Sequence, residues 1–323
     1  NGDTPEVLQR RVMEQAEWDL HVSRTAIWKH INILKERGYI FESSTRKGYR
    51  LIYAPNLLTP LEIDSALHTE TFGRHVVYLS STTSTNEEAK KIAREGAEEG
   101  TIVVAEEQTG GRGRLTRSFY CPFAKGIWFT LILRPKFFPM EASKCTLMAA
   151  VGVCRGIRRL GLQDAGIKWP NDILYHGKKL VGILTEMSAS MEKIDYIIIG
   201  AGINTGMKKS EFPELFRESA TSFLAEGIDV SRKDLLAAIL AELEKEYEIA
   251  QTQGFDKVLE DWKVLSVTLG QDVRVIMGEE NYTGKAVDID KDGCLLVDTG
   301  EKVERVIAGD VSIRPIDAPL PKR

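Results

Sequence analysis

The sequence has few of the residues and patterns that indicate a metal site, a disulfide framework or a membrane segment. Its four cysteines, Cys121, Cys145, Cys154 and Cys294, include no C-x-x-C pair, which argues against a zinc site or a set of disulfides. Reduced thiols are typical of the cytoplasm, where we expect this protein. No apolar run approaches the roughly 18 residues of a transmembrane helix, and no signal-peptide pattern opens the sequence. We therefore expect no membrane partner.

The two common signatures of phosphate-binding loops are also missing. Nothing matches the P-loop pattern G-x-x-x-x-G-K-[ST] or the dinucleotide fingerprint G-x-G-x-x-G. A nucleotide would therefore have to be held by side chains on a different kind of loop. The formal charge of −4 excludes a chain that coats nucleic acid over its whole surface, but it permits a local basic patch. The length of 323 residues, 43% of them hydrophobic, predicts two or three domains with sizeable cores.

The first of three segments, residues 1–56, has the pattern of a winged helix-turn-helix. A helix is predicted to begin at the N-cap Ser23, because Ile27, Ile31 and Leu34 follow on one helical face. A shorter helical stretch precedes it, and two extended runs around a basic turn come after it. Helix, helix and hairpin is the order of elements in a winged helix-turn-helix domain.

A local excess of positive charge favours DNA as the partner of this first segment. Residues 21–50 contain seven Lys or Arg and two Glu, in a chain that is acidic as a whole. Such a patch indicates contact with phosphates. The candidate DNA-binding residues are Ser23, Arg24, Thr25, Trp28 and Lys29 on the helix and Arg46 and Lys47 in the turn. The alternative is a small helical domain whose charges are only solvated.

The other two segments complete a predicted α+β multidomain fold. Residues 57–266 alternate between strand and helix patterns without a regular βαβ array, which predicts a mixed α/β catalytic domain. Strands are expected at 75–80, 100–108, 126–135 and 195–205, a hairpin at 165–187, and helices at 84–96, 143–161 and 231–254. Residues 267–323 carry almost only short strand patterns with Gly and Asp turns, and these predict a small β-barrel.

The most unusual stretch is TGGRGRLTRSFYCP, residues 109–122. It contains Arg112, Arg114 and Arg117 and no acidic residue, and its glycines permit close approach of the backbone to a ligand. Three guanidinium groups are suited to stabilise negative charge that develops on a phosphate during its transfer. The alternative interpretation is a solvated surface loop.

Four further segments carry hydrogen-bonding or charged side chains. They are STN (84–86), KWPNDI (168–173), KKLVGILTE (178–186) and GAGIN (200–204). Each also has a purely structural interpretation. STN is compatible with a capping box, the Pro-Asn-Asp sequence is a common turn signal, and GAGIN can be a tight turn at the end of a strand.

In the order and position of five motifs behind a winged helix, the sequence resembles the bifunctional biotin protein ligases and biotin operon repressors of bacteria. The motifs are STN, QTGGRGR, KWPNDI, KKLVGILTE and GAGIN. The resemblance covers about Val22 to Ile316, and GRGR together with KWPND is specific to biotin ligases. It implies that biotin and ATP, with magnesium, give biotinyl-5′-AMP, and that biotin then passes to a lysine of a biotin carboxyl carrier domain of acetyl-CoA or pyruvate carboxylase. It also implies a homodimer in the adenylate-bound state, which binds operator DNA and represses genes of biotin synthesis or transport.

The resemblance also assigns roles by position. The residues matched to the biotin site are Ser84, Thr85, Asn86, Gln108, Gly111, Arg112, Gly113, Arg114 and Lys179. Those matched to the catalytic machinery are Lys179, Arg112, Arg114, Arg117 and Asp172. Those matched to the adenylate site are Phe119, Lys168, Asn171 and Asn204. The ligands of magnesium are not assigned.

The stretch before Ser23 is short for a full first helix, a turn and a second helix, and in the ligase segment the sequence departs from the family at two further places. Leu115 and Thr116 follow GRGR, where relatives often continue with arginine and glycine, and Phe119 stands where many relatives have a tryptophan that packs on adenine. Two other functions stay open. One is a lipoate or octanoate ligase-like acyl transferase, although such proteins generally lack GRGR and a winged helix. The other is a ligand-sensing repressor without catalysis, which would not require Lys179, Asp172 and three loop arginines together.

Overall fold

The computed structural model describes residues 24–36, 39–44, 48–53, 56–114, 117–277, 280–308 and 311–315. The chain divides into two compact units, Asn1–Asn56 and Leu57–Arg323. No helix in these described ranges is both long enough and apolar enough to cross a membrane.

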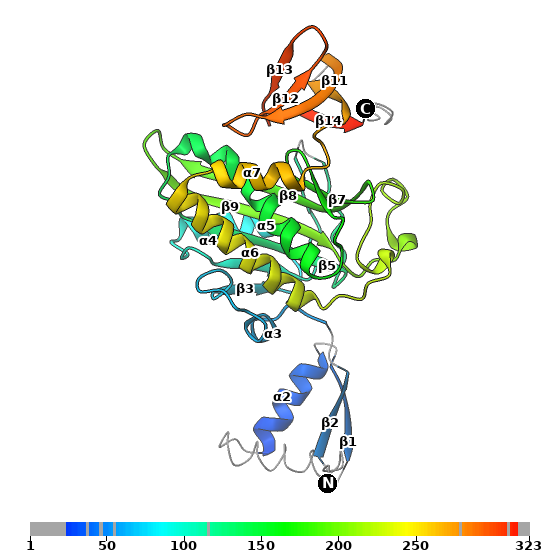
Figure 1. Ribbon diagram of the computed structural model, residues 1–323. Helices are drawn as coiled ribbons and strands as arrows, with labels where there is room; N and C mark the ends of the chain where they lie inside the picture. Colours follow the sequence, from blue (N-terminus) through cyan, green and yellow to red (C-terminus); the bar gives the residue numbers. More distant parts are fainter. Residues whose placement is uncertain are drawn as a thin grey trace, which may run out of the picture. The chain divides into compact units, whose positions relative to one another are not determined.

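The first unit contains the predicted helix and hairpin (Figure 1). Helix α2 (Arg24–Glu36) is followed by the antiparallel strands β1 (Ile40–Ser44) and β2 (Gly48–Tyr53). On α2 the predicted apolar face is half-buried, whereas Thr25, Trp28 and Lys29 are exposed, so the predicted division of the helix into two faces is confirmed. The shorter helical stretch, Ser23, Arg46 and Lys47 lie outside the described residues.

A seven-stranded sheet forms the centre of the second unit, in the order β3-β4-β5-β9-β8-β7-β6. Its strands are β3 (Val76–Leu79), β4 (Ile102–Ala105), β5 (Gly126–Leu133), β6 (Gly166–Lys168), β7 (Asp172–Tyr175), β8 (Lys178–Ala189) and β9 (Ile194–Asn204). Strands β3 and β4 are parallel and the other neighbours are antiparallel. β5 is buried along its whole length, which explains why its sequence is a continuous apolar run rather than an alternating one.

Helices cover both faces of this sheet. The helical elements of the unit are α3 (Pro60–Asp64), α4 (Thr85–Arg94), η1 (Pro139–Lys144), α5 (Cys145–Arg159), η2 (Lys209–Glu211), η3 (Leu224–Glu226), α6 (Arg232–Gln253) and α7 (Asp256–Leu265). Helices α5, α6 and α7 pack beside one another on one face (Figure 1). Helix α4 packs on the other face, where Ala89 and Ala93 contact Val103 and Ile198. The sheet therefore has two separate apolar layers, with the candidate segment STN at the start of α4.

A buried ion pair joins the beginning of this unit to its core. Arg232 and Glu106 are 2% and 0% exposed and lie 2.8 Å apart. Glu106 Oε1 also accepts a hydrogen bond of 2.7 Å from the backbone N–H of Leu58, and Arg232 donates to the carbonyl of Gly126 at 2.8 Å. These bonds satisfy both charges, as a buried pair requires.

The C-terminal strands form an open sheet, and the predicted closed β-barrel is wrong for the described residues. The strands are β10 (Asp272–Met277), β11 (Glu280–Ile289), β12 (Leu295–Asp298), β13 (Val303–Val306) and β14 (Val311–Pro315), in the order β13-β12-β11-β10-β14. β13 and β14 are its two edges, and no described pairing joins them. Whether a sheet closes into a barrel depends on the tilt and stagger of its strands. The spacing of strand and turn residues in the sequence does not determine either quantity.

Candidate active site

The N-terminus of α4 is attached to the segment after β4 through Gln108. Its Oε1 accepts hydrogen bonds from the backbone N–H of Thr85 at 2.7 Å and from Thr85 Oγ1 at 3.0 Å. Gln108 Nε2 donates to Cys121 Sγ at 3.2 Å. Ser84 is the N-cap residue, but its side chain makes no capping hydrogen bond to the described helix. The capping-box interpretation is therefore wrong, and the Ser84 hydroxyl lies where a helix N-terminus can receive a polar ligand.

Asn86 points into the protein rather than into an open site. It is 7% exposed, its Nδ2 donates to Glu186 Oε2 at 2.8 Å, and its Oδ1 accepts from Thr130 Oγ1 at 2.7 Å. Its amide fills the space above Gly200, where an added Cβ would come within 2.0 Å of Oδ1. The structure thus places this predicted residue behind Thr85.

The arginine loop folds back on itself. Gly113 donates its N–H to the carbonyl of Arg117 at 2.7 Å, and Phe119 donates to the carbonyl of Gly111 at 2.8 Å. Gly111 has no room for a side chain, because a Cβ there would lie 2.5 Å from the carbonyl oxygen of Phe119. Arg112 and Arg117 are exposed, whereas Arg114 is only partly exposed and is brought against the neighbouring segment.

Arg112 acts electrostatically on Glu87 of α4. The pKa of Glu87 is below its usual range, chiefly because Lys90 donates a hydrogen bond to it, and Arg112 adds a smaller attraction.

A second group of charged residues comes from the KWPNDI and KKLVGILTE segments. Arg114 Nη1 donates to Asn171 Oδ1 at 3.2 Å, and Asn171 Nδ2 donates to the carbonyl of Ile183 at 2.7 Å. Lys179 Nζ lies 2.8 Å from Asp172 Oδ1. The loop, β7 and β8 thus bring a guanidinium, an ammonium and a carboxylate into one small region.

Lys168, also predicted for this region, is partly exposed and lies opposite Asp172 in the pairing of β6 with β7.

Glycines form a surface without side chains beside these charges. Gly182 on β8 and Gly202 on β9 are register partners, and the ring of Phe119 lies on both. A Cβ at Gly202 would come within 2.7 Å of that ring, and one at Gly182 within 3.0 Å. Lys179 Nζ lies 5.5 Å from the ring centre. We call the space over Gly182 and Gly202 the glycine slot.

Asn204 lies at the end of β9, buried to 3% exposure, and its Nδ2 donates to the carbonyl of Thr221 at 3.0 Å. Its amide nitrogen thus holds the segment around residue 221.

The structure gathers two groups of predicted residues. One group is Thr85, Gln108 and Gly111, and the other is Arg114, Phe119, Asn171, Asp172 and Lys179.

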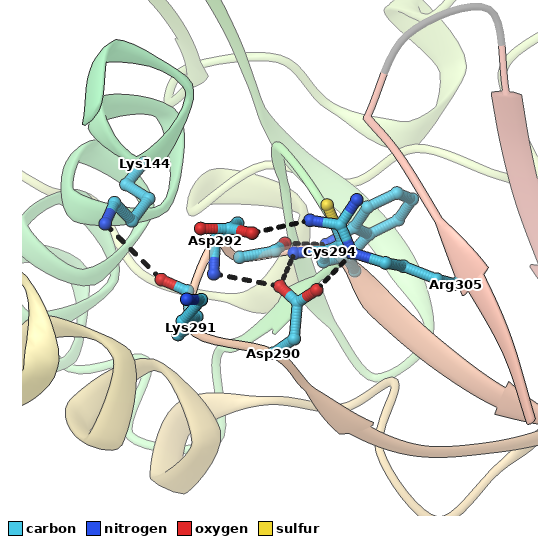
Figure 2. A network of polar contacts seen from close by, with 8 residues as sticks. Lys144, Asp290, Lys291, Asp292, Cys294 and Arg305 are labelled. Atoms are coloured by element: carbon cyan, nitrogen blue, oxygen red, sulfur yellow. Dashed lines mark hydrogen bonds and ion pairs between the residues drawn. The ribbon is translucent and has the colours of Figure 1, made fainter. Parts of the chain in front are cut away.

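Two loops next to the strands of the C-terminal sheet fix the KWPNDI segment. Trp169 donates its backbone N–H to Thr268 Oγ1 at 2.9 Å and its indole N–H to the carbonyl of Gly293 at 3.1 Å. Figure 2 shows how the loop around Gly293 is itself held: Asp290 Oδ1 accepts from the N–H groups of Asp292 and Cys294, each at 2.9 Å, and Arg305 pairs with both aspartates. Asn171 and Asp172 therefore follow a residue that is anchored at two points.

Two residues of the site were missed by the sequence analysis, Thr130 and Glu186. Thr130 is the single polar side chain in the run GIWFTLIL, and a polar residue in an otherwise apolar buried strand is the signal that indicates a buried partner. Glu186 ends the KKLVGILTE segment, but nothing local indicates that its partner is Asn86.

Comparison with known proteins gives three family matches. The Biotin/lipoate A/B protein ligase family matches residues 78–204, the Biotin protein ligase C terminal domain matches residues 268–314, and the HTH domain matches residues 19–50.

Related proteins and solved structures agree with these matches. The chain is 40% identical over 295 residues to the bifunctional ligase/repressor BirA of Bacillus subtilis, with 91% of each chain covered. It is 30% identical over 301 residues to the bifunctional ligase/repressor BirA of Escherichia coli, with 93% of this chain and 92% of that protein covered. The biotin protein ligase from Aquifex aeolicus in complex with biotin and ATP superposes with a TM-score of 0.66 and 28% identity, covering 75% of this chain and 99% of that one.

Proposed function

The chain belongs to the bifunctional ligase/repressor family of biotin protein ligases, and from that premise we propose that it activates biotin with ATP and transfers it to a carrier protein. The observation that carries this proposal is the placement of Arg114, Asp172 and Lys179 beside the glycine slot. The ring of Phe119 covers these glycines, so a flat bicyclic ligand would bind beside that ring, with its carboxylate directed toward Lys179. Ser84, Thr85 and Gln108 supply hydrogen-bonding groups at the N-terminus of α4.

In the first step a carboxylate oxygen of biotin attacks the α-phosphorus of ATP. A carboxylate–phosphorus bond forms, the bond to the β-phosphate oxygen breaks, and pyrophosphate leaves. Both reactants are anions, so the step needs concentrated positive charge. Lys179 and Arg114 supply it. Asp172 holds the ammonium of Lys179, and Asn171 holds the guanidinium of Arg114, at the distances given above.

In the second step the amine of a carrier lysine attacks the carbonyl carbon of biotinyl-5′-AMP. An amide bond forms, AMP leaves with the electrons of the anhydride bond, and the amine loses a proton. The mixed anhydride is susceptible to hydrolysis, and we propose that the arginine loop covers it and excludes water until the carrier domain binds.

Magnesium is part of this proposal as the ion that accompanies ATP. It prefers carboxylate oxygens, phosphates and water, and the side chain of Asp172, 20% exposed beside Lys179, fits as the protein ligand. When bound, the ion would neutralise part of the phosphate charge. Phe119, Lys168 and Asn204 stay proposed contacts of the adenylate, and Arg112 and Arg117 stay proposed cations of the closed loop.

The direct test is to incubate the protein with biotin, ATP, magnesium and a biotin carboxyl carrier domain, and to read the carrier mass. We expect a mass increase of one biotinyl group and release of pyrophosphate, and no increase with lipoate in place of biotin. Modification by lipoate but not by biotin would assign the chain to the other acyl ligases.

The repressor half of the function is proposed for a homodimer. We propose residues 1–56 as the DNA-binding domain, 57–266 as the catalytic domain and 267–323 as the C-terminal domain. β7 pairs with β8 only as far as Gly182. In the described structure residues 184–189 of β8 therefore have no strand on the side opposite β9. An open strand edge of this kind can pair with another chain, and two winged helices can bind two half-sites of an operator.

Arg114→Ala is expected to lower the rate of adenylate formation, or its retention, by about tenfold or more. A charged hydrogen bond contributes roughly 1.5–3 kcal/mol, and Arg114 is the loop cation that reaches Asn171. The measurement is pyrophosphate release together with the amount of adenylate that stays bound after rapid gel filtration. Arg159→Ala, which removes an equally charged side chain at the exposed end of α5, is the matched control. An Arg114→Ala protein that forms and holds adenylate like the parent would contradict the role of the loop.

Operator binding is expected to tighten when biotinyl-5′-AMP fills the site. The adenylate supplies an anion to a loop rich in arginine, and the ordered loop can complete a surface that pairs two protomers. A ligand shifts such an equilibrium only by its differential affinity for the two states, and the coupling is typically about 5- to 150-fold. DNA affinity should be measured without ligand, with biotin, and with biotin plus ATP, alongside sedimentation. Equal DNA affinity in all three samples would be compatible with the proposed ligase activity and would contradict the proposed control of DNA binding by the adenylate.

A further inference from the structure

We propose that Thr130 and Glu186 are positioning residues for the biotin site: together they fix the side chains of the first turn of α4, so that Thr85 and Gln108 are held in place before the ligand arrives. This inference rests on the proposed function, because it concerns the end of the site that would receive biotin. It adds two residues that do not touch the ligand themselves and that act through Asn86 and Thr85.

Thr130 lies in the middle of β5 with 0% exposure, opposite Gly200 on β9. Its Oγ1 is 2.7 Å from Asn86 Oδ1 and 2.8 Å from Thr85 Oγ1. Because Gly200 has no side chain, the amide of Asn86 fits between the sheet and α4. The polar hydroxyl inside an apolar strand therefore serves the start of the helix on the sheet face that α4 covers.

Glu186 holds the same helix from β8. Its Oε2 accepts from Asn86 Nδ2 at 2.8 Å, and its Oε1 pairs with Lys90 Nζ at 2.6 Å, one turn further along α4. A carboxylate in this ion pair can only accept hydrogen bonds. Glu186 therefore determines which end of the Asn86 amide faces β8, and Oδ1 must face Thr130.

In this arrangement the single hydroxyl proton of Thr130 is donated to Asn86 Oδ1. Asn86 Oδ1 cannot donate, so Thr130 donates to it, and the lone pairs of Thr130 Oγ1 are left to receive the proton of Thr85. The Thr85 hydroxyl then has two acceptors, Thr130 Oγ1 at 2.8 Å and Gln108 Oε1 at 3.0 Å. Gln108 Oε1 already accepts the backbone N–H of Thr85 at 2.7 Å. A continuous polar chain thus runs from Glu186 to Gln108.

Removing a buried member of this chain should leave the backbone of the first turn in place but free the side chains of Thr85 and Gln108. Biotin would then have to order them on binding, and affinity falls when a site is not preorganised. The charges that act on ATP, on Lys179 and Arg114, belong to other elements. The effect should therefore fall on biotin binding and leave the reaction with ATP nearly unchanged.

The test uses the full chain with Thr130→Val, which keeps the shape and removes the hydroxyl, and Thr130→Ser, which keeps the hydroxyl. Thr185→Val is the control, because Thr185 Oγ1 is buried and has no hydrogen-bond partner among the described residues. Calorimetry with biotin alone should show Kd raised about tenfold for Thr130→Val. Thr130→Ser and Thr185→Val should stay within about twofold of the parent.

Kinetics separate positioning from a general structural loss. For Thr130→Val the KM for biotin should rise with the Kd, while kcat and the KM for ATP stay within about twofold of the parent. Unchanged biotin affinity, or a parallel loss in kcat and in both KM values, would overturn the inference. A parent chain that binds no biotin would instead overturn the proposed function.

Glu186 gives an independent second test, since its side chain is 34% exposed and tolerates substitution better than a fully buried one. Glu186→Gln keeps an oxygen that accepts from Asn86, whereas Glu186→Leu does not. We expect weaker biotin binding for Glu186→Leu and near-parental binding for Glu186→Gln. If Thr130→Val fails to fold, this pair decides the inference, and equal biotin affinities for the two Glu186 variants would refute it.

Discussion

Lys179→Ala is expected to lower kcat/KM for biotinyl-5′-AMP formation by about 100- to 1,000-fold, the range seen when one group that stabilises developing charge is removed. Lys179 Nζ lies 2.8 Å from Asp172 Oδ1 and 5.5 Å from the centre of the Phe119 ring. Its ammonium is therefore held between Asp172 and the Phe119 ring, where we propose that the carboxylate of biotin and the α-phosphate of ATP meet. Single-turnover release of pyrophosphate measures the step directly.

The neighbouring lysine provides a control with the same chemistry. Successive residues of a strand point to opposite faces, and Lys178 acts on a different group. The pKa of Glu218 is lowered chiefly by a hydrogen bond from Lys209, and Lys178 contributes a smaller attraction. Lys178→Ala should therefore keep nearly parental activity. Similar losses in the two variants, with melting curves that show both are folded, would remove Lys179 from the catalytic role.

Much of the fold follows from local patterns. The predicted helices at 143–161 and 231–254 are α5 and α6, and the predicted strands at 126–135 and 195–205 contain β5 and β9. Each has a clear start or stop, such as Ser231 capping α6 through the N–H of Asp234. The closed barrel was a wrong prediction because closure is not a local property, and α7 was not predicted at all.

For the candidate site, too, some residues could be predicted from the sequence and some contacts could not. The arginine loop and the lysine of β8 were found because their chemistry is unusual in sequence. The pairing of Asn86 with Thr130 and Glu186 joins residues 44 and 100 positions apart, and such a contact exists only after β5, β8 and α4 have packed. The sequence also left open whether Ser84 caps α4 or serves a ligand, because both interpretations use the same residues.

Deleting residues 1–56 is expected to remove specific DNA binding and to leave biotin activation intact. Specific protein–DNA complexes are typically about 10³-fold or more tighter than nonspecific ones, and the deletion removes α2 with its exposed Thr25, Trp28 and Lys29. The unit that remains, Leu57–Arg323, is compact. The measurements are binding to a promoter fragment that the full chain recognises and pyrophosphate release with biotin and ATP. A truncated protein that still binds the fragment specifically would contradict the division of the chain.

The position of the cut decides whether the truncated chain is stable, and a slightly longer deletion tests this. Leu57 and Leu58 are 6% and 0% exposed, and the N–H of Leu58 donates to Glu106, which pairs with Arg232. Burial of a leucine side chain contributes roughly 1.5–3 kcal/mol, so deleting residues 1–59 should lower the free energy of unfolding by about 3 kcal/mol or more relative to the deletion of 1–56. Urea unfolding of the two proteins gives the comparison. Equal stabilities would mean that the buried pair does not depend on Leu58, and would place the true start of the catalytic unit further along the chain.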